Sequence, residues 1–305
     1  MLEHILTIHY PSYQQQGFSL APFANKALAL AGTHPVIDRA IIELPFICPD
    51  ISHFNRTHLL QAFRDEKVST SSAILYTFWW GGLSHPYQAP KLYQNPVLDR
   101  LERTGGMIAR ELILLAQEQS IESFKARLKD IFMEQQRGEY KLSGIGTSFF
   151  TKILQFGVQA RKQDNLVGPL PIIADKWSMR GAMADMKVTG FEWETIFIGP
   201  NKQGAFAFIG RVEEEFESYW KFINYFSERV ESLRDTYQGI DAFRMEELVF
   251  GWPRDIDNPS NPRHIASQII ETKTHSYMTF QELRSKLNED GIRIPNFPSL
   301  RSSTP

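Results

Sequence analysis

Residues 142–177 constrain the fold of this chain more than any other stretch, because they place two glycines between two helical patterns. Gly144 and Gly146 flank Ile145, and the apolar residues that follow recur at helical spacing: Phe149, Phe150, Ile153 and Leu154. Glycine has no Cβ atom and accepts a positive φ, so a Gly-x-Gly segment at this place predicts a tight turn. The sequence therefore predicts a helix, a short turn and a second helix, with Ser143 or Thr147 as the N-cap of the second.

The same turn predicts an anion-binding site. The first amides of a helix have no partner within the helix, and glycine lets a ligand approach them closely, so such a turn suits a phosphate group. An ordinary turn without a ligand is the alternative. The residues predicted to contact the phosphate are Ser143, Gly144, Gly146, Thr147 and Ser148.

A resemblance to a known family starts from these residues. Gly-Ile-Gly-Thr between two helical patterns, followed by Asp175 at the start of a further helical pattern, resembles the helix-hairpin-helix DNA glycosylases, in particular their 8-oxoguanine glycosylase-like bacterial branch. The resemblance implies a mainly α, two-lobed helical fold with a few short strands, in which Gly144 and Gly146 bind a DNA phosphate. It also implies that Asp175, in Ala-Asp-Lys-Trp, lies at the mouth of a base pocket.

The lysine that lyase-competent members carry is displaced in this sequence. Ser148 stands at the family's usual place, and Lys152 follows one helical turn later on the same face. Two interpretations of Lys152 are open: a relocated nucleophile that forms a Schiff base, or a charged group that holds a phosphate. A solvated lysine on a polar face is the structural alternative.

The predicted catalytic residues are Asp175 and Lys152. Breaking an N-glycosidic bond builds positive charge on the sugar, and a carboxylate beside the sugar stabilises that charge. Asp175 is also well placed to be no more than the N-cap of a helix from Lys176. The base must first be flipped out of the duplex, and aromatic side chains commonly stack on such a base. The predicted pocket residues are Trp79, Trp80 and Trp177, with core packing as the alternative for Trp79 and Trp80.

The net charge of the chain argues mildly against a protein that coats nucleic acid without sequence specificity. The formal net charge over 305 residues is −2, whereas proteins that coat DNA are usually basic. A local basic patch satisfies DNA binding equally well. The central stretch supplies the candidates for one: Lys141, Lys152, Arg161, Lys162, Lys176 and Arg180.

Cysteine and histidine usage predicts a protein without a metal or other cofactor. Cys48 is the single cysteine, so an internal disulfide and a four-cysteine iron–sulfur cluster are excluded, and a reducing cytoplasm is compatible. The histidines show no paired helical spacing. No apolar run approaches the roughly 18 residues of a membrane span, and no signal pattern begins the chain. We expect a cytoplasmic monomer that binds DNA and no membrane.

The predicted organisation is a glycosylase-like helical domain over 1–254, with two lobes around a cleft and the hairpin near 142–157, and a partly irregular extension over 255–305. Residues 40–46 predict a short strand or a buried helix ending at Pro45, and Thr57 is the predicted cap of a helix over 58–65. A helix over 98–115 is predicted to be broken at Gly105-Gly106 or to continue through it. Further helices are predicted over 73–80, 121–132, 212–233, 243–250 and 279–288, a weak strand pair over 191–198 and 204–209, and disorder over 295–305.

The predicted function is a DNA glycosylase that excises a modified base. The resemblance suggests an oxidised purine by default, and the altered lysine position leaves room for a hypermodified phage base, such as glucosylated 5-hydroxymethylcytosine, in antiviral defence. An 8-oxoguanine repair glycosylase/lyase and a non-catalytic DNA-binding module are the alternatives.

Overall fold

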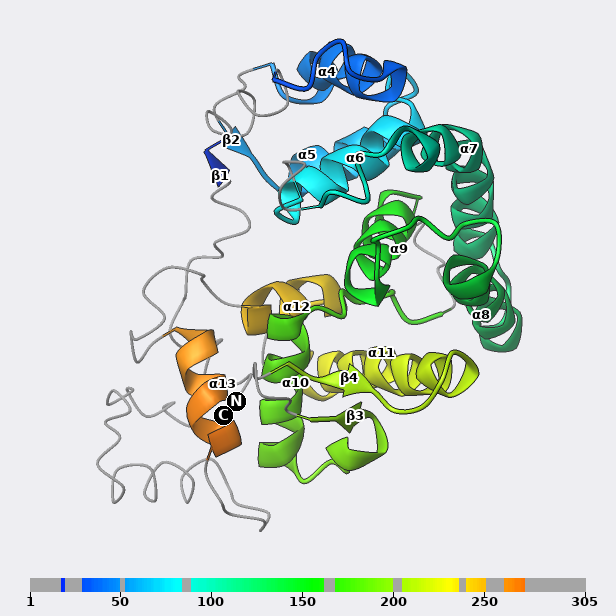
Figure 1. Cartoon of the computed structure of the whole chain (residues 1–305). Helices are drawn as coiled ribbons and strands as arrows, with labels where there is room; N and C mark the ends of the chain where they lie inside the picture. The colour runs from blue at the N-terminus through cyan, green and yellow to red at the C-terminus, as the bar shows by residue number, and fades with distance from the viewer. Residues whose placement is uncertain are drawn as a thin grey trace.

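A computed structural model describes residues 18–19, 29–49, 53–83, 89–161, 168–199, 205–235, 240–250 and 261–271. Across these ranges the chain is mainly α-helical, as predicted (Figure 1). The helices are α4 (Pro35–Ile47), α5 (Arg56–Arg64), α6 (Thr70–Trp80), α7 (Asn95–Ala116), α8 (Ile121–Arg137), α9 (Thr147–Arg161), α10 (Lys176–Thr189), α11 (Glu213–Leu233), α12 (Ala242–Phe250) and α13 (Pro262–Glu271). Two antiparallel pairs of two-residue strands join them, β1 (Phe18–Ser19) with β2 (His53–Phe54) and β3 (Phe197–Ile198) with β4 (Ala207–Phe208). None of the helices in these ranges is both long and apolar enough to cross a membrane.

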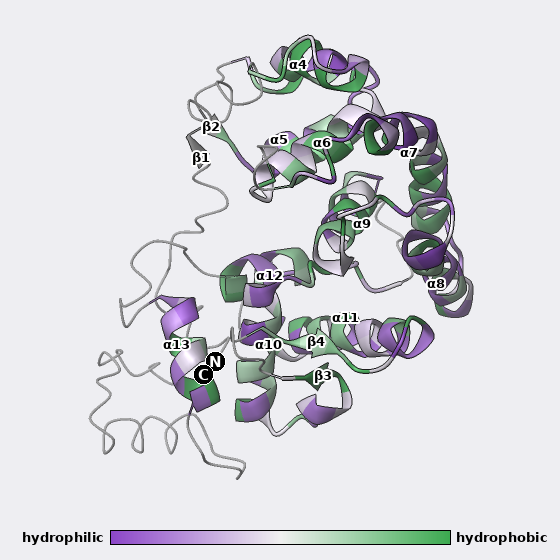
Figure 2. Ribbon diagram, viewed as in Figure 1, coloured by the Kyte–Doolittle hydropathy of each residue, from purple (hydrophilic) through white to green (hydrophobic). Residues whose placement is uncertain are grey.

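Helix α9 lies at the centre of the arrangement. It packs against α5, α6 and α7, which occupy the upper part of Figure 1, and the chain then descends to α10. There α10 packs against α12 and α13, and α11 packs against α8 and α12. Colouring by hydropathy shows that α7 and α8 each carry both hydrophilic and hydrophobic residues (Figure 2). The two ends of the central stretch therefore belong to different groups of helices, with α9 above and α10 below.

Local capping chemistry decides where the N-terminal helices begin. Asn55 accepts hydrogen bonds from the amides of Thr57 and His58, so α5 begins at Arg56 and the predicted cap at Thr57 is wrong. Ser69 caps α6 by accepting from the amide of Ser72, so the helix begins at Thr70, before the predicted 73–80 segment.

Two predicted interruptions are absent from the observed helices. Helix α7 continues through Gly105-Gly106, and a Cβ atom on Gly105 would lie 2.4 Å from Ser71 Oγ, so this glycine permits close contact with α6. The helical alternative for 40–46 is confirmed, but α4 runs past Pro45 to Ile47. Pro45 lies in the last turn of α4, where it has no N–H to donate to the carbonyl of Ile41, so the helix continues past it with one main-chain hydrogen bond fewer.

The C-terminal half follows the predicted pattern with shorter strands. The pair β3–β4 is confirmed, with Phe197 opposite Phe208, and residues 193–195 form a 3-10 turn instead of extending the strand. Helices α11 and α12 match the predicted helical segments. Part of the predicted extension forms α13, which packs on α10. The predictions for 279–288 and 295–305 lie outside the described residues.

Candidate functional site

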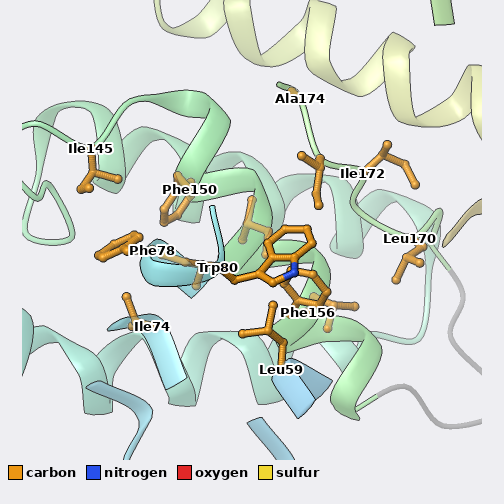
Figure 3. Close-up of a cluster of buried hydrophobic side chains, with 14 of the residues drawn as sticks. Leu59, Ile74, Phe78, Trp80, Ile145, Phe150, Phe156, Leu170, Ile172 and Ala174 are labelled. Atoms are coloured by element: carbon orange, nitrogen blue, oxygen red, sulfur yellow. The ribbon is translucent and has the colours of Figure 1, made fainter. Parts of the chain in front are cut away.

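The glycine turn joins α8 to α9 and is anchored by one apolar side chain. Gly144 has φ +85°, a conformation that favours glycine. Ile145 is buried, and Figure 3 shows it in the apolar cluster with Phe78 and Phe150. Gly144 and Gly146 on either side are exposed. The turn therefore presents its glycine backbone outward while its one large side chain fixes it to the core.

Polar contacts from neighbouring helices hold the turn. Gln135 of α8 donates to the carbonyl of Ile145 at 3.1 Å, and Gln136 donates to Thr147 Oγ1 at 3.0 Å. Thr147 Oγ1 in turn donates to Glu215 of α11 at 2.7 Å. Because α9 begins at Thr147, Gly146 occupies the N-cap position, and the prediction of Ser143 or Thr147 there is wrong.

The start of α9 is suited to an anion. Phe149 and Phe150 donate to the carbonyl of Gly146, so the amides of Thr147 and Ser148 precede the first main-chain hydrogen bonds of the helix. A Cβ atom placed on Gly146 would meet no atom within 4 Å, which leaves open space in front of the backbone. The Glu215 carboxylate beside Thr147 weakens the attraction for a phosphate but leaves these donors in place.

Lys152 and Asp175, the two predicted catalytic residues, are in direct contact. Lys152 Nζ lies 3.2 Å from Asp175 Oδ2, and the side chains are 5% and 14% exposed respectively, so the solvated-lysine alternative is wrong. The ammonium also lies 3.4 Å from Ser148 Oγ and 4.9 Å from the centre of the Phe149 ring. The displaced lysine and the serine at the family's usual position therefore share one site.

Side chains of α9 place Asp175 beside Lys152. The segment before Asp175 runs along α9 without forming secondary structure, and two of its amides donate to α9 side chains. Gln155 Oε1 accepts from the amide of Ile173 at 3.0 Å, and Thr151 Oγ1 accepts from that of Ala174 at 2.9 Å. Thr151 precedes Lys152 directly, so the same turn of α9 fixes the segment and supplies the lysine.

The two oxygens of Asp175 have different partners. Oδ1 accepts from the amides of Trp177 and Ser178, each at 3.0 Å, and so caps α10, while Oδ2 faces Lys152. Burial by itself raises the pKa of the Asp175 carboxyl, but the Lys152 charge and the two amides outweigh it and hold the pKa below its ordinary value. Asp175 is thus the N-cap of α10, the alternative role that the sequence suggested for it, and it is also an ionised partner of Lys152.

This lowered pKa predicts acid sensitivity. A carboxyl whose pKa is lower in the folded state stabilises the protein above its unfolded pKa, and that stabilisation is lost as the pH falls through the folded pKa. We expect the difference in free energy of unfolding between the wild type and Asp175→Asn to be largest near neutral pH and to shrink in acid. Urea unfolding at a series of pH values measures it, and a difference independent of pH would contradict the ion pair.

A second buried ion pair lies directly behind Asp175. Glu246 of α12 is fully buried, accepts from Ser178 Oγ at 2.5 Å and pairs with the guanidinium of Arg56, which is 2% exposed. The Arg56 guanidinium also lies over the rings of Trp80, Phe156 and Phe243, the last at 4.4 Å from its centre. Sequence reasoning missed this pair. The available signal was that Glu246 shares a helical face with Phe243 and Phe250.

The predicted pocket tryptophans have different surroundings. Trp79 and Trp80 are 1% and 6% exposed; Trp79 donates to Tyr93 Oη at 3.0 Å, and Trp80 packs edge-on against Phe156 (Figure 3). Neither ring offers an exposed face, which favours core packing for both. Trp177 is half-buried, and the Arg263 guanidinium of α13 lies 4.3 Å from its ring centre.

The predicted basic patch does not form one surface. Lys152 and Arg180 are buried, the first against Asp175 and the second donating to Ser267 Oγ at 2.9 Å. Arg161 lies over the Phe63 ring. Lys141 and Lys176 are exposed, and Lys162 lies outside the described residues. Tertiary packing uses Lys152 and Arg180 internally, which helical spacing alone did not reveal.

Within the described ranges, no group of three or more His, Cys, Asp or Glu side chains is arranged to hold a metal ion, and Cys48 is buried. Comparison with protein-family models, curated proteins and solved structures finds no match for this chain.

Proposed function

We propose that this protein is a DNA glycosylase of the helix-hairpin-helix type that excises a modified base. The observation that carries the proposal is the contact between Lys152 and Asp175 immediately behind the exposed glycine turn. A phosphate donor set, a lowered-pKa carboxylate and a buried lysine come together, as a glycosylase needs. The two-lobed arrangement around a cleft, the monomeric state and the cytoplasmic location predicted from the sequence belong to the same proposal.

In the proposed reaction the amides of the turn bind a backbone phosphate and the target nucleotide rotates out of the duplex. The N-glycosidic bond then breaks, its electron pair leaves with the base, and the Asp175 carboxylate stabilises the positive charge on the sugar. Asp175 then accepts a proton from the water that attacks the sugar carbon, and the departing base takes up a proton from solvent, which completes the hydrolysis. Lys152 is held against Asp175 by their ion pair, so it orients that carboxylate and attracts phosphate, and water is the nucleophile.

The proposed substrate class is a modified base in DNA, with hypermodified cytosine such as glucosylated 5-hydroxymethylcytosine favoured and 8-oxoguanine as the alternative. Ser148 in place of the family's lysine favours a base-removing enzyme without strand cleavage. The test is incubation with DNAs that carry different modified bases, phage genomic DNA included, followed by mass spectrometry of released bases. If the protein binds these DNAs but releases no base, the glycosylase proposal is wrong and the alternative, a non-catalytic DNA-binding module, takes its place.

The ion pair between Lys152 and Asp175 predicts that no covalent intermediate forms. Borohydride treatment during the reaction is expected to trap no protein–DNA adduct, because an ammonium paired with Asp175 has no free electron pair for attack on the sugar. Denaturing gel electrophoresis of labelled DNA measures the adduct. A trapped adduct that disappears in Lys152→Ala would instead establish the lyase alternative.

The glycine turn predicts a specific binding defect. Gly146→Ala places a methyl group in open space, so the fold tolerates it, but the methyl blocks phosphate approach to the amides. Loss of one charge-assisted hydrogen bond, about 1.5–3 kcal/mol, weakens DNA binding about 10- to 100-fold. Gly106→Ala, exposed on α7 and also free of contacts at Cβ, is the matched control and is expected to bind normally. Equal affinity of both variants in fluorescence anisotropy would exclude the turn from the DNA interface.

A further inference from the structure

We propose that Glu246 is a positioning residue for Asp175, holding the first turn of α10 from behind through Ser178 with Arg56 as its counter-ion. This inference rests on the proposed function, because it assigns Asp175 the reacting role. Neither the glycine turn nor the resemblance to glycosylases requires a second buried carboxylate.

Ser178 is the bridge between the two carboxylates. Its amide donates to Asp175 Oδ1 at 3.0 Å, and its hydroxyl donates to Glu246 Oε1 at 2.5 Å. The second oxygen of Glu246 pairs with Arg56 of α5. The residue that receives the Asp175 cap is therefore itself fixed by α12, and α12 is fixed by α5, a helix from the other end of the described chain.

A buried ion pair at this place is better explained by positioning than by stability. Desolvating two charges costs several kcal/mol per ion, and apolar residues of similar volume often replace such a pair without loss of stability. The pair instead fixes an orientation: the hydrogen bonds that Ser178 makes to Glu246 and Asp175 set both the angle and the position of the first turn of α10. A carboxylate that must face a developing charge needs that fixed orientation.

The charges around Asp175 form two pairs. Lys152 faces it from α9 and Glu246 lies behind it on α12, with Arg56 beyond on α5 and exposed Lys176 next in the chain. Burial raises the pKa of the Glu246 carboxyl, Arg56 and the Ser178 hydroxyl oppose that rise, and the negative charge of Asp175 adds to it. Each carboxylate has its own cation, and the charge of each pair acts on the pKa of the other carboxylate.

Opposite shifts are therefore expected when the two partners are changed separately. Glu246→Gln leaves Arg56 without a counter-ion and adds net positive charge, so the pKa of Asp175 falls. Arg56→Met removes the cation, so the stranded Glu246 carboxyl raises the pKa of Asp175 over the pH range in which Glu246 stays ionised. Arg56→Lys keeps the charge and is expected to leave it near the wild-type value. A residue that served packing alone would not give shifts of opposite sign.

The test is a pH titration of the Asp175 carboxyl in the full chain, monitored by 13C NMR. The signal is assigned to Asp175 by its absence from the spectrum of Asp175→Asn. Single-turnover base release is expected to slow about 10- to 100-fold in Glu246→Gln, with DNA affinity kept. Asp185→Asn is the matched control, since Asp185 is a buried carboxylate on the same helix, paired with Arg229 at 2.9 Å. It is expected to change neither the Asp175 titration nor the rate.

The outcomes separate the two proposals. An Asp175 titration that is the same in Glu246→Gln, Arg56→Met and the wild type would overturn the positioning role, as would equal shifts in Asp185→Asn. If Arg56→Met does not fold, Ser178→Ala replaces it, and base release at the wild-type rate in that variant would also overturn the role. Absence of base release by the wild type contradicts the glycosylase proposal alone, because the NMR titration needs no activity.

Discussion

Asp175→Asn is expected to reduce single-turnover base release at least about 100-fold, the usual cost of removing one electrostatic stabiliser of a transition state. Asparagine is as good an N-cap as aspartate, so the cap of α10 is retained and the change isolates the charge. Mass spectrometry of the released base over time measures the rate. DNA affinity, which the glycine turn supplies in the proposed function, is expected to persist.

The variant also leaves Lys152 buried without its counter-ion, which by itself disturbs the site. The double variant Lys152→Met/Asp175→Asn removes that charge as well and controls for it. Because Lys152 also has a proposed role at the site, the double variant reports only on the stability effect of the stranded charge. Loss of base release in Asp175→Asn, with an unchanged circular dichroism spectrum and retained DNA binding, would assign the loss to the missing carboxylate. Base release by Asp175→Asn at the wild-type rate would remove Asp175 from the reaction.

Arg56→Met is expected to give the largest loss of stability among the changes considered. The substitution leaves the fully buried Glu246 carboxylate without a cation, and breaking a buried pair in this way typically costs about 3–5 kcal/mol. It also removes the guanidinium that lies over Phe243 and Trp80. A stranded Glu246 takes up a proton more readily, so the loss is expected to be smaller in acid than at neutral pH.

Urea unfolding measures this loss, and two variants define its cause. Arg56→Met/Glu246→Leu replaces both charges with apolar groups and is expected to recover most of the stability. Arg234→Met breaks an exposed pair with Glu231, whose side chains are 63% and 68% exposed, and is expected to change stability little. Equal losses in Arg56→Met and in the double variant would attribute the effect to packing and not to the stranded charge.

The sequence by itself determined the helical class, the glycine turn and the pair of candidate residues. Helical spacing is local, so α6, α8, α11 and α12 were predictable from residues a few positions apart. The turn was predictable because Gly144 supplies the positive φ that other residues avoid. Helix beginnings were less certain, since Asn55 and Thr57 are both competent caps for α5 and only the local geometry selects Asn55.

The tertiary structure decided which side chains share a site. Lys152 and Asp175 meet because Thr151 and Gln155 bind the segment before Asp175, a contact between residues that no periodic pattern links. Glu246 and Arg56 lie 190 positions apart in the chain, and their pairing depends on how α5 and α12 pack around α9 and α10. Spacing along a helix specifies which face of that helix a residue occupies. Packing of the whole core decides which neighbouring helix that face contacts, and it also decides that Trp79, Trp80 and Arg180 are buried.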